Sequence, residues 1–189
     1  MPMPTKLPIV DWPAVAESGL DYNSWLEIGT YEANITKLKE LYDRQEFQAD
    51  VTARLTSLSR PIHIVAISED WCPDVIRHVA VLQKMADQSD AITVHYVTRD
   101  SHEDFFIRFL TNGGEAIPKF VFLSDQFVEC GNWGPMPECC KELISRGKAC
   151  GDVKSARVKV AECYKSDKER IKVVTELMRL IDIAAADAA

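Results

Sequence analysis

An almost uninterrupted apolar segment constrains the fold of this sequence more than any other feature. Residues 62–67 read Ile-His-Ile-Val-Ala-Ile, follow Pro61 directly and are rich in β-branched side chains. Such a run is typical of a strand buried on both faces of a sheet, because a strand with one solvated face alternates apolar and polar residues. Residues 91–97 form a second run of this kind. The two runs predict an α/β fold with a parallel pair of buried strands.

Other segments after residue 60 supply helices and a hairpin. Apolar residues three or four positions apart predict an amphipathic helix between the two strands: Val75, Val79, Leu82 and Ala86. A further helix is expected over residues 101–110, and residues 120–123 and 127–130 flank a short loop, as in a hairpin. Pro135 and Pro137 open a helix that is expected to run to Arg146 and stop at Gly147.

This order of elements leaves few possible layouts. A β-α-β unit has a right-handed crossover, and the hairpin strands must be antiparallel. We expect a central mixed four-stranded sheet in the order second, first, third, fourth, flanked by helices. Residues 61–147 would form this domain, residues 1–60 a helical N-terminal annex and residues 148–189 a C-terminal helical extension, all packed as one unit. The annex is expected to pack on the sheet through one helix face: Tyr31, Ile35 and Leu38.

Composition and charge limit which cellular location and which binding partners are expected. Of 189 residues, 47% are hydrophobic and 27% charged, the balance of a globular chain. No apolar run reaches the roughly 18–20 residues of a membrane span and no signal-peptide stretch opens the sequence, so a cytoplasmic location is expected. A net charge of −7 suits nucleic acid poorly. Residues 148–172 carry eight Lys and Arg against four Asp and Glu, which we interpret as a solvated helix face rather than a nucleic-acid or partner contact.

The chain has six cysteines: Cys72, Cys130, Cys139, Cys140, Cys150 and Cys163. In a chain of this length and expected compartment, reduced, catalytic or metal-bound thiols are better first interpretations than a disulfide framework. No Cys-x-x-Cys pair is present, and the spacing of the last four cysteines matches no usual structural zinc site. We therefore predict neither a metal nor a cofactor.

Cys72 has the position best suited to chemistry. It lies in a Trp-Cys-Pro turn between the first buried strand and the next helix, where Pro73 suits the first helical position. Functional groups gather at the carboxyl ends of strands in open α/β sheets, and a helix N-terminus favours a thiolate. Nearby carboxylates oppose this effect: Glu69, Asp70 and Asp74. A partly exposed, modestly reactive thiol is expected, and the alternative is a small buried apolar side chain.

Three motifs, taken in order, resemble the thioredoxin superfamily. Residues 69–74 (EDWCPD) follow the buried strand, residues 114–119 (GEAIPK) open a later strand, and residues 133–135 (WGP) close the hairpin. The resemblance covers about residues 60–147, and within the superfamily the motifs look like those of a bacterial thioredoxin-like group with a helical N-terminal extension. It implies a thioredoxin-like fold in which Cys72 is the nucleophile.

The resemblance also implies a substrate site. Pro118 would be cis and lie against Cys72, and the backbone of Ile117 would offer strand-like hydrogen bonds to a substrate chain. The rest of the groove would be lined by three further residues: Trp71, Pro73 and Trp133. The alternative is a trans proline at the first residue of a strand, which needs no function.

Three departures from the family pattern limit the chemistry. The second active-site cysteine of the family would fall at Val75, its buried acid at Ala66, and the lysine that often follows at Ile76. Cys72 could still attack a disulfide, because exchange needs one thiolate, but residue 75 could not resolve the product. Resolution would need an external thiol or an internal one, for which the candidates are Cys130, Cys139 and Cys140.

The histidines belong to no recognisable motif. His63 and His95 fall within the two buried strands, and His78 and His102 are expected on solvated helix turns. The sequence contains no nucleophile–base pair, paired carboxylates or phosphate loop.

Two functions are consistent with these features. The leading one is thiol–disulfide exchange by a monothiol oxidoreductase that forms mixed disulfides through Cys72. Its partners would be protein or low-molecular-weight thiols and disulfides, not nucleic acid or membrane. The alternative is a redox-inactive thioredoxin-fold module that binds a protein partner in the groove near Pro118.

Overall fold

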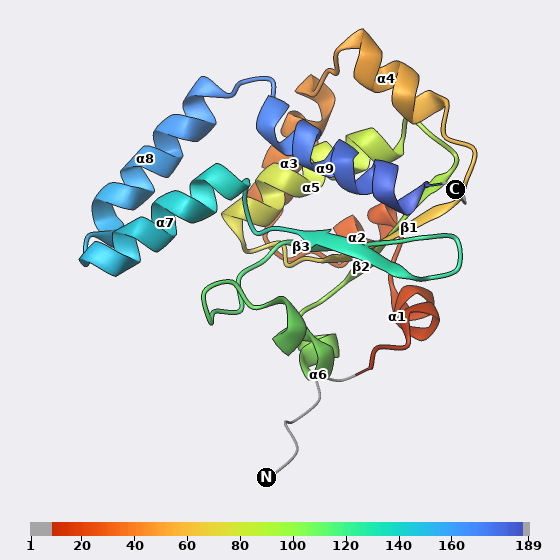
Figure 1. Cartoon of the computed structure of the whole chain (residues 1–189), viewed down its shortest axis with the longest axis horizontal. Coiled ribbons are helices and arrows are strands. Elements are labelled where there is room, and N and C mark those ends of the chain that lie inside the picture. The colour runs from red at the N-terminus through yellow and green to blue at the C-terminus, as the bar shows by residue number, and fades with distance from the viewer. Residues whose placement is uncertain (1–8, 187–189) are drawn as a thin grey trace.

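The computed structural model describes residues 9–186, without the side chains of residues 103 and 104. The outer ends of the expected annex and extension, residues 1–8 and 187–189, lie outside the described residues. Figure 1 shows the elements from red to blue in this order: α1 (Trp12–Ser18), α2 (Tyr22–Glu27), α3 (Glu32–Arg44), α4 (Ala49–Thr56), β1 (Ile62–Ile67), α5 (Pro73–Ala86), β2 (Ile92–Val97), η1 (Asp100–His102), α6 (Glu103–Phe106), η2 (Ile107–Phe109), β3 (Lys119–Leu123), β4 (Glu129–Trp133), α7 (Glu138–Cys150), α8 (Val153–Ser166) and α9 (Ile171–Ala184).

The sheet has the predicted strand order, β2-β1-β3-β4. β1 pairs in parallel with β2, and β3 pairs antiparallel with both β1 and β4. β1 and β3 lie in the middle of the sheet, and every residue of β3 is buried. Apolar runs supply these two strands because both of their faces are covered. The predicted fold class, an α/β fold with a mixed four-stranded sheet flanked by helices, is confirmed.

Helices from both ends of the chain cover the sheet. α9 packs on β3 and β4 beside α5, and α5 also contacts β2 (Figure 1). From the annex, α1 contacts β1 and β2, and α2 contacts β2. Helices from both ends of the chain thus contribute to the cover of the central sheet.

One part of the annex packs differently from the prediction. α3 lies against α5 instead of the sheet, with Leu38 fully buried between them. Tyr31, which we expected on the same buried face, is 53% exposed. The reason is local: Tyr31 precedes the helix as its N-cap and has a non-helical backbone, so it does not share the helical spacing of Leu38.

The predicted end of α7 at Gly147 is wrong. The helix continues to Cys150 and ends at Gly151, which has a left-handed backbone with φ 76°. Gly147 serves packing instead, because a Cβ at this position would lie 2.5 Å from the Cβ of Ala156 on α8. The missing side chain lets α7 and α8 pack closely as an antiparallel pair, which projects from the sheet at the left of Figure 1.

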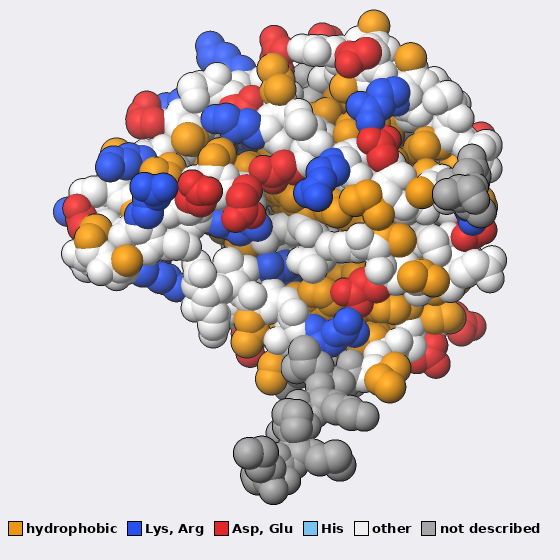
Figure 2. Space-filling view, viewed as in Figure 1, with side chains coloured by type: hydrophobic (Ala, Val, Ile, Leu, Met, Phe, Trp, Pro, Cys, Tyr) orange, Lys and Arg blue, Asp and Glu red, His pale blue; other side chains and the backbone are white. Residues whose placement is uncertain are grey.

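The outer surface of this helix pair is highly charged. Figure 2 shows Lys and Arg side chains together with acidic ones over α7 and α8. Most of the basic segment lies on α8, where Lys154, Lys159 and Lys165 are exposed to solvent. None of the described helices is both long and apolar enough to cross a bilayer.

Candidate functional site

Cys72 is the N-cap residue of α5, directly before Pro73 at the first helical position. Its Sγ donates a hydrogen bond to the carbonyl oxygen of Ile117, 3.5 Å away. The Ile117–Pro118 peptide bond is cis and lies just before β3. The structure therefore brings Cys72 to the Ile117–Pro118 segment, although Cys72 and Ile117 are 45 residues apart in the sequence.

The thiol of Cys72 is less accessible than we expected. The residue is only 9% exposed, which corrects the prediction of a partly exposed thiol. Burial raises the pKa of the Cys72 thiol above its ordinary value, and the Asp74 carboxylate raises it further. The backbone N–H groups of Val75 and Asp74 at the start of α5 lower it, but less than burial raises it. The free thiol is therefore mainly protonated at neutral pH.

The annex holds the loop before Cys72 in place. Asp70 accepts hydrogen bonds from the backbone N–H groups of Thr30 at 2.5 Å and Tyr31 at 2.8 Å, just before α3. Asn34 of α3 donates to the backbone carbonyl of Asp70 at 2.8 Å. The sequence predicts Asp70 to be a negative charge near the thiol, within the 69–74 motif. Its position shows a second role, which is to fix the Cys72 loop to the annex.

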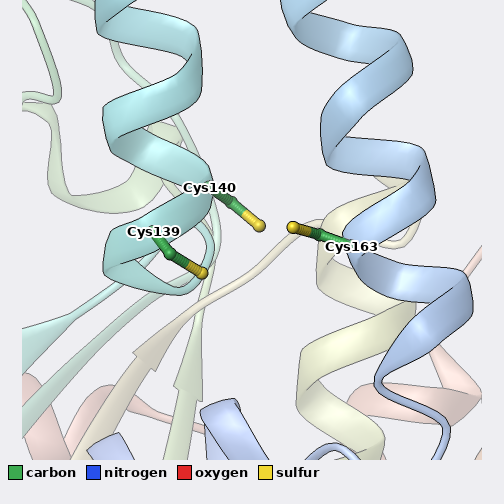
Figure 3. A group of neighbouring side chains, drawn as sticks. All are labelled: Cys139, Cys140 and Cys163. Atoms are coloured by element: carbon green, nitrogen blue, oxygen red, sulfur yellow. The ribbon is translucent and has the colours of Figure 1, made fainter.

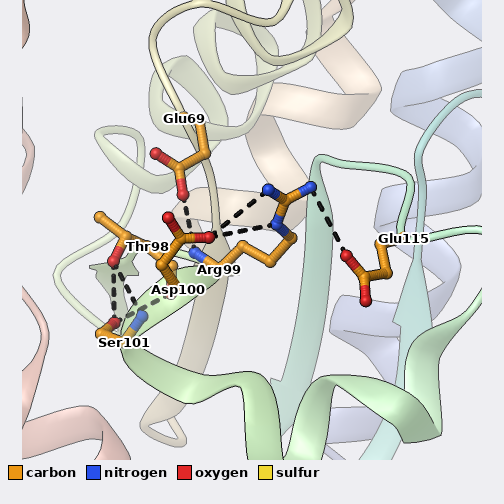
Figure 4. A network of polar contacts seen from close by, with 6 residues as sticks. All are labelled: Glu69, Thr98, Arg99, Asp100, Ser101 and Glu115. Atoms are coloured by element: carbon orange, nitrogen blue, oxygen red, sulfur yellow. Dashed lines mark hydrogen bonds and ion pairs between the residues drawn. The ribbon is translucent and has the colours of Figure 1, made fainter.

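A second polar network joins the loop before Cys72, the end of β2 and the loop before Ile117 (Figure 4). Glu69 accepts a hydrogen bond from the backbone N–H of Arg99 at 2.9 Å. The guanidinium of Arg99 pairs with Asp100 at 3.4 Å and with Glu115 at 3.8 Å, and it lies 5.9 Å from the Trp71 ring centroid. Burial raises the pKa of the Glu69 carboxyl. Arg99 thus connects the end of β2 to the segment that leads to Ile117. Sequence reasoning missed Arg99, because no motif includes it.

The groove residues differ in accessibility. Trp71 is 43% exposed, and Pro73 is also exposed. Trp133, which we expected to line the groove, is only 4% exposed. Its indole N–H donates to Glu176 of α9 at 2.6 Å, and its ring stacks on Phe120. Trp133 therefore fixes α9 to β4, and Trp71 is the aromatic residue presented beside Cys72.

Lys119 is a further residue that the sequence analysis did not single out. It follows Pro118 and is only 4% exposed. Its Nζ donates to Thr111 at 2.7 Å and to the backbone carbonyl of Gly134 at 2.9 Å, which ties both segments to the start of β3. Burial lowers the pKa of Lys119 to about 8. A charged residue at the first position of a wholly buried strand was the signal that could have identified it.

The three departures from the family pattern are all buried apolar residues. Val75 and Ala66 are fully buried, and Ile76 is 4% exposed. These positions therefore offer neither a second thiol nor a proton acceptor near Cys72. The apolar surroundings also account for the raised thiol pKa, because a thiolate loses its hydration there.

The three candidate resolving cysteines lie in two places. Cys130 is on β4, three residues before Trp133, which is about 10 Å along a strand. Cys139 and Cys140 are on the first turn of α7, next to Cys163 of α8 (Figure 3). The three sulfurs lie within 4.8 Å of one another. Burial and the two neighbouring thiols raise the pKa of Cys140 to about 12.

One histidine is more deeply buried than predicted. His78 is fully buried in α5, which corrects its assignment to a solvated turn, and its ring lies 5.0 Å from that of Trp133. Its Nε2 lies 3.3 Å from the hydroxyl of Tyr164 on α8. The rings of His63 and His95 meet across β1 and β2 with nitrogens 3.2 Å apart. His78 is buried because α8 and α9, which follow residue 147 in the chain, pack against α5. The sequence around His78 therefore could not predict its burial.

We predict that acid destabilises the fold through these histidines. Burial lowers the pKa of His63, His95 and His78, and Arg170 and Arg77 lower that of His78 further. The unfolded chain therefore binds more protons, and stability falls as the pH drops below about 6.5, the pKa of an unfolded histidine. His78 alone would contribute a slope of up to about 1.4 kcal/mol per pH unit. Urea unfolding between pH 7.5 and 5 measures it. His78→Phe should show a shallower slope, and an unchanged slope would contradict the prediction.

Comparisons with known proteins agree with the thioredoxin-like fold. A family model described as Thioredoxin matches residues 22–157, which extends the similarity from the annex into α8. A solved structure of a protein of unknown function from Pseudomonas aeruginosa is 16% identical, with a TM-score of 0.72 over 92% of this chain and 98% of that chain. An HIV epitope scaffold is 15% identical, with a TM-score of 0.69 and the same coverage. At these identities the two structures show the fold alone. No curated protein matches the chain.

Proposed function

This chain belongs to the thioredoxin family, and we propose that it takes part in thiol–disulfide exchange through the single thiol of Cys72. The observation that carries the proposal is the placement of the Cys72 Sγ at the N-terminus of α5, 3.5 Å from the carbonyl oxygen of Ile117. A strand end that meets a helix N-terminus provides N–H groups for a thiolate, and the backbone beside Pro118 can pair with an extended substrate.

The proposed reaction has two steps. The Cys72 thiol loses its proton to solvent, and the thiolate attacks one sulfur of a substrate disulfide. A mixed disulfide forms, and the other substrate sulfur leaves as a thiolate that takes up a proton. Val75 has no thiol with which to resolve this disulfide, so it persists until an external thiolate attacks the substrate sulfur. A disulfide then forms between the external and substrate sulfurs, the bond to Cys72 breaks, and Cys72 leaves as a thiolate that takes up a proton.

A second candidate function is protein binding without redox chemistry. The 9% exposure of Cys72 and the raised pKa of its thiol favour it, because both slow attack on a disulfide. The exposed ring of Trp71, held near Arg99, would then be the main contact with the partner. Aromatic and arginine side chains are the residues that most often dominate protein interfaces.

Incubation with glutathione disulfide tests the exchange proposal. We expect one glutathione adduct that maps to Cys72 when the more accessible thiols have been replaced by serine: Cys130, Cys139, Cys150 and Cys163. Because burial raises the thiol pKa, the rate should climb steadily from pH 7 to above pH 9. The added change Cys72→Ser should abolish the adduct. Intact-protein and peptide mass spectrometry measure these outcomes.

The same experiment separates the two candidate functions. If Cys72 stays unmodified in the folded chain at pH 8 while Cys150 of the unchanged chain reacts fully, the exchange proposal fails and the binding function replaces it. Circular dichroism of each variant shows whether the chain is still folded. A Cys72 adduct that appears only in denaturant would count as the same failure.

A further inference from the structure

The cysteines of α7 and α8 form a cluster away from the Cys72 thiol. Cys139 and Cys140 occupy successive positions on the first turn of α7, and Cys163 lies opposite them on the last turn of α8. Figure 3 shows the sulfurs of Cys140 and Cys163 pointing toward each other across the gap between the helices, with the sulfur of Cys139 beside them. All three sulfurs lie within 4.8 Å of one another.

The helix pair holds these sulfurs in place. α7 and α8 are joined by a tight turn at Gly151 and pack closely where Gly147 faces Ala156. Tyr164, the neighbour of Cys163, connects α8 to α5 through hydrogen-bond contacts with His78 and with Asp74 at 3.2 Å. The backbone positions that carry the thiols are therefore fixed by contacts other than the thiols themselves.

The geometry suits a shared ion better than a disulfide. A metal bound to thiolates at about 2.3 Å sets its sulfurs roughly 4 Å apart, so the three thiols need little adjustment. A disulfide would draw one pair to about 2.05 Å and leave the third thiol without a role. Cys139 and Cys140 are successive residues of a helix, so their side chains leave the helix in different directions (Figure 3). They are therefore not placed to form a disulfide with each other.

We propose that Cys139, Cys140 and Cys163 form a three-thiolate site for a soft d10 metal ion, either Cu⁺ or Zn²⁺. Thiolates are the ligands that select these ions. Among the side chains that the structure describes, which leave out those of residues 103 and 104, no fourth cysteine, histidine or carboxylate joins the cluster. Three sulfurs complete a trigonal site for Cu⁺, whereas Zn²⁺ would add one ligand from solvent. On binding, the thiols release their protons to the buffer and no electrons are transferred.

The burial of the three residues agrees with such a site. Cys140 is fully buried, whereas Cys139 and Cys163 are half-buried, so the cluster is closed on one side and reachable on the other. An ion can enter beside the two accessible thiols and meet the third in a protected position. The spacing in the sequence indicated no metal site, because Cys163 is separated from the adjacent pair by a helix, a turn and most of a second helix.

Metal titration of a chain that keeps only these three thiols tests the proposal. We start from the full chain with Cys72→Ser, Cys130→Ser and Cys150→Ser, fully reduced under anaerobic conditions, so that the outcome is independent of exchange at Cys72. Zn²⁺ and Cu⁺ are added separately against a colorimetric chelator. We expect one ion per chain in at least one titration, and the ion that binds identifies the geometry of the site. Adding Cys163→Ser should weaken binding by more than about 100-fold.

Two results would overturn the proposal. One is that neither ion binds stoichiometrically to the reduced chain while circular dichroism shows that it is folded. The other is that Cys163→Ser and Cys140→Ser leave the affinity unchanged, which would place the ion elsewhere. The matched control restores the exposed Cys150 to the triple variant, and it should not alter the affinity or the stoichiometry.

Discussion

Replacing Val75 with cysteine is expected to convert a chain that retains its mixed disulfide into one that releases it. Val75 is fully buried on the first turn of α5, three residues after Cys72. Residues three apart on a helix have Cα atoms about 5 Å apart, within the range that a disulfide spans. The introduced thiol can therefore attack the Cys72 sulfur, form an internal disulfide and release the substrate as a thiol. Catalytic reduction of insulin by an excess of dithiol measures the gain.

The gain from Val75→Cys should be incomplete for a reason that the structure makes clear. Ala66, where the family carries an acid, is fully buried and offers no proton acceptor to the introduced thiol. A positioned acid or base contributes about 10²–10⁴-fold to a proton-transfer step, so turnover should stay at least about 100-fold below that of a complete dithiol centre.

Two variants and one observation bear on this prediction. Val75→Ser supplies a similar polar group without a thiol and should remain inactive, and Val75→Cys combined with Cys72→Ser should lose the gained activity. The monothiol account is wrong if the unmodified chain already reduces insulin catalytically and keeps this activity without its three candidate resolving thiols, Cys130, Cys139 and Cys140.

The sheet was predictable because its signal is local. The run at residues 62–67 forms β1 in the middle of the sheet, where all its residues but His63 are buried. The run at residues 91–97 forms the edge strand β2, whose Thr93 is exposed, so the prediction that this strand is buried on both faces is wrong. The crossover rule leaves few orders for the strands. The meeting of Cys72 with Ile117 followed from the family resemblance, and the 3.5 Å contact of its sulfur agrees with it.

The parts that could not be predicted depend on contacts between distant segments. Asp70 bonds to the backbone at Thr30, and the sulfur of Cys163 joins a pair more than 20 residues earlier. Neither contact corresponds to a periodic pattern of residues from which it could be predicted. Gly147 was misinterpreted for a related reason: a glycine near the expected end of a helix indicates a stop, yet the same absence of a side chain permits close packing by Ala156.

Gly134→Ala is expected to be the most damaging single substitution near the site. Gly134 has φ 120°, a backbone conformation that residues with a side chain rarely adopt, and a Cβ there would lie 2.0 Å from the carbonyl oxygen of Pro118. The clash involves backbone on both sides, so no side-chain rotation relieves it. Lys119 also holds the two segments together by donating to the Gly134 carbonyl. Backbone strain and overpacking together should cost about 3 kcal/mol or more, a large share of the stability of an ordinary domain.

Gly113→Ala is the matched control, because it measures the cost of a side chain at a positive φ without the cost of a steric clash. Gly113 also has a positive φ, 75°, but a Cβ there meets no atom within 4 Å. Its replacement should therefore cost only about 1–2 kcal/mol, the strain of a left-handed backbone. Urea unfolding compares the two variants, and equal losses would show that Pro118 moves aside without penalty. Because Pro118 follows the residue whose carbonyl accepts the Cys72 hydrogen bond, Gly134→Ala should also change the rate at which Cys72 forms its adduct, whereas Gly113→Ala should not.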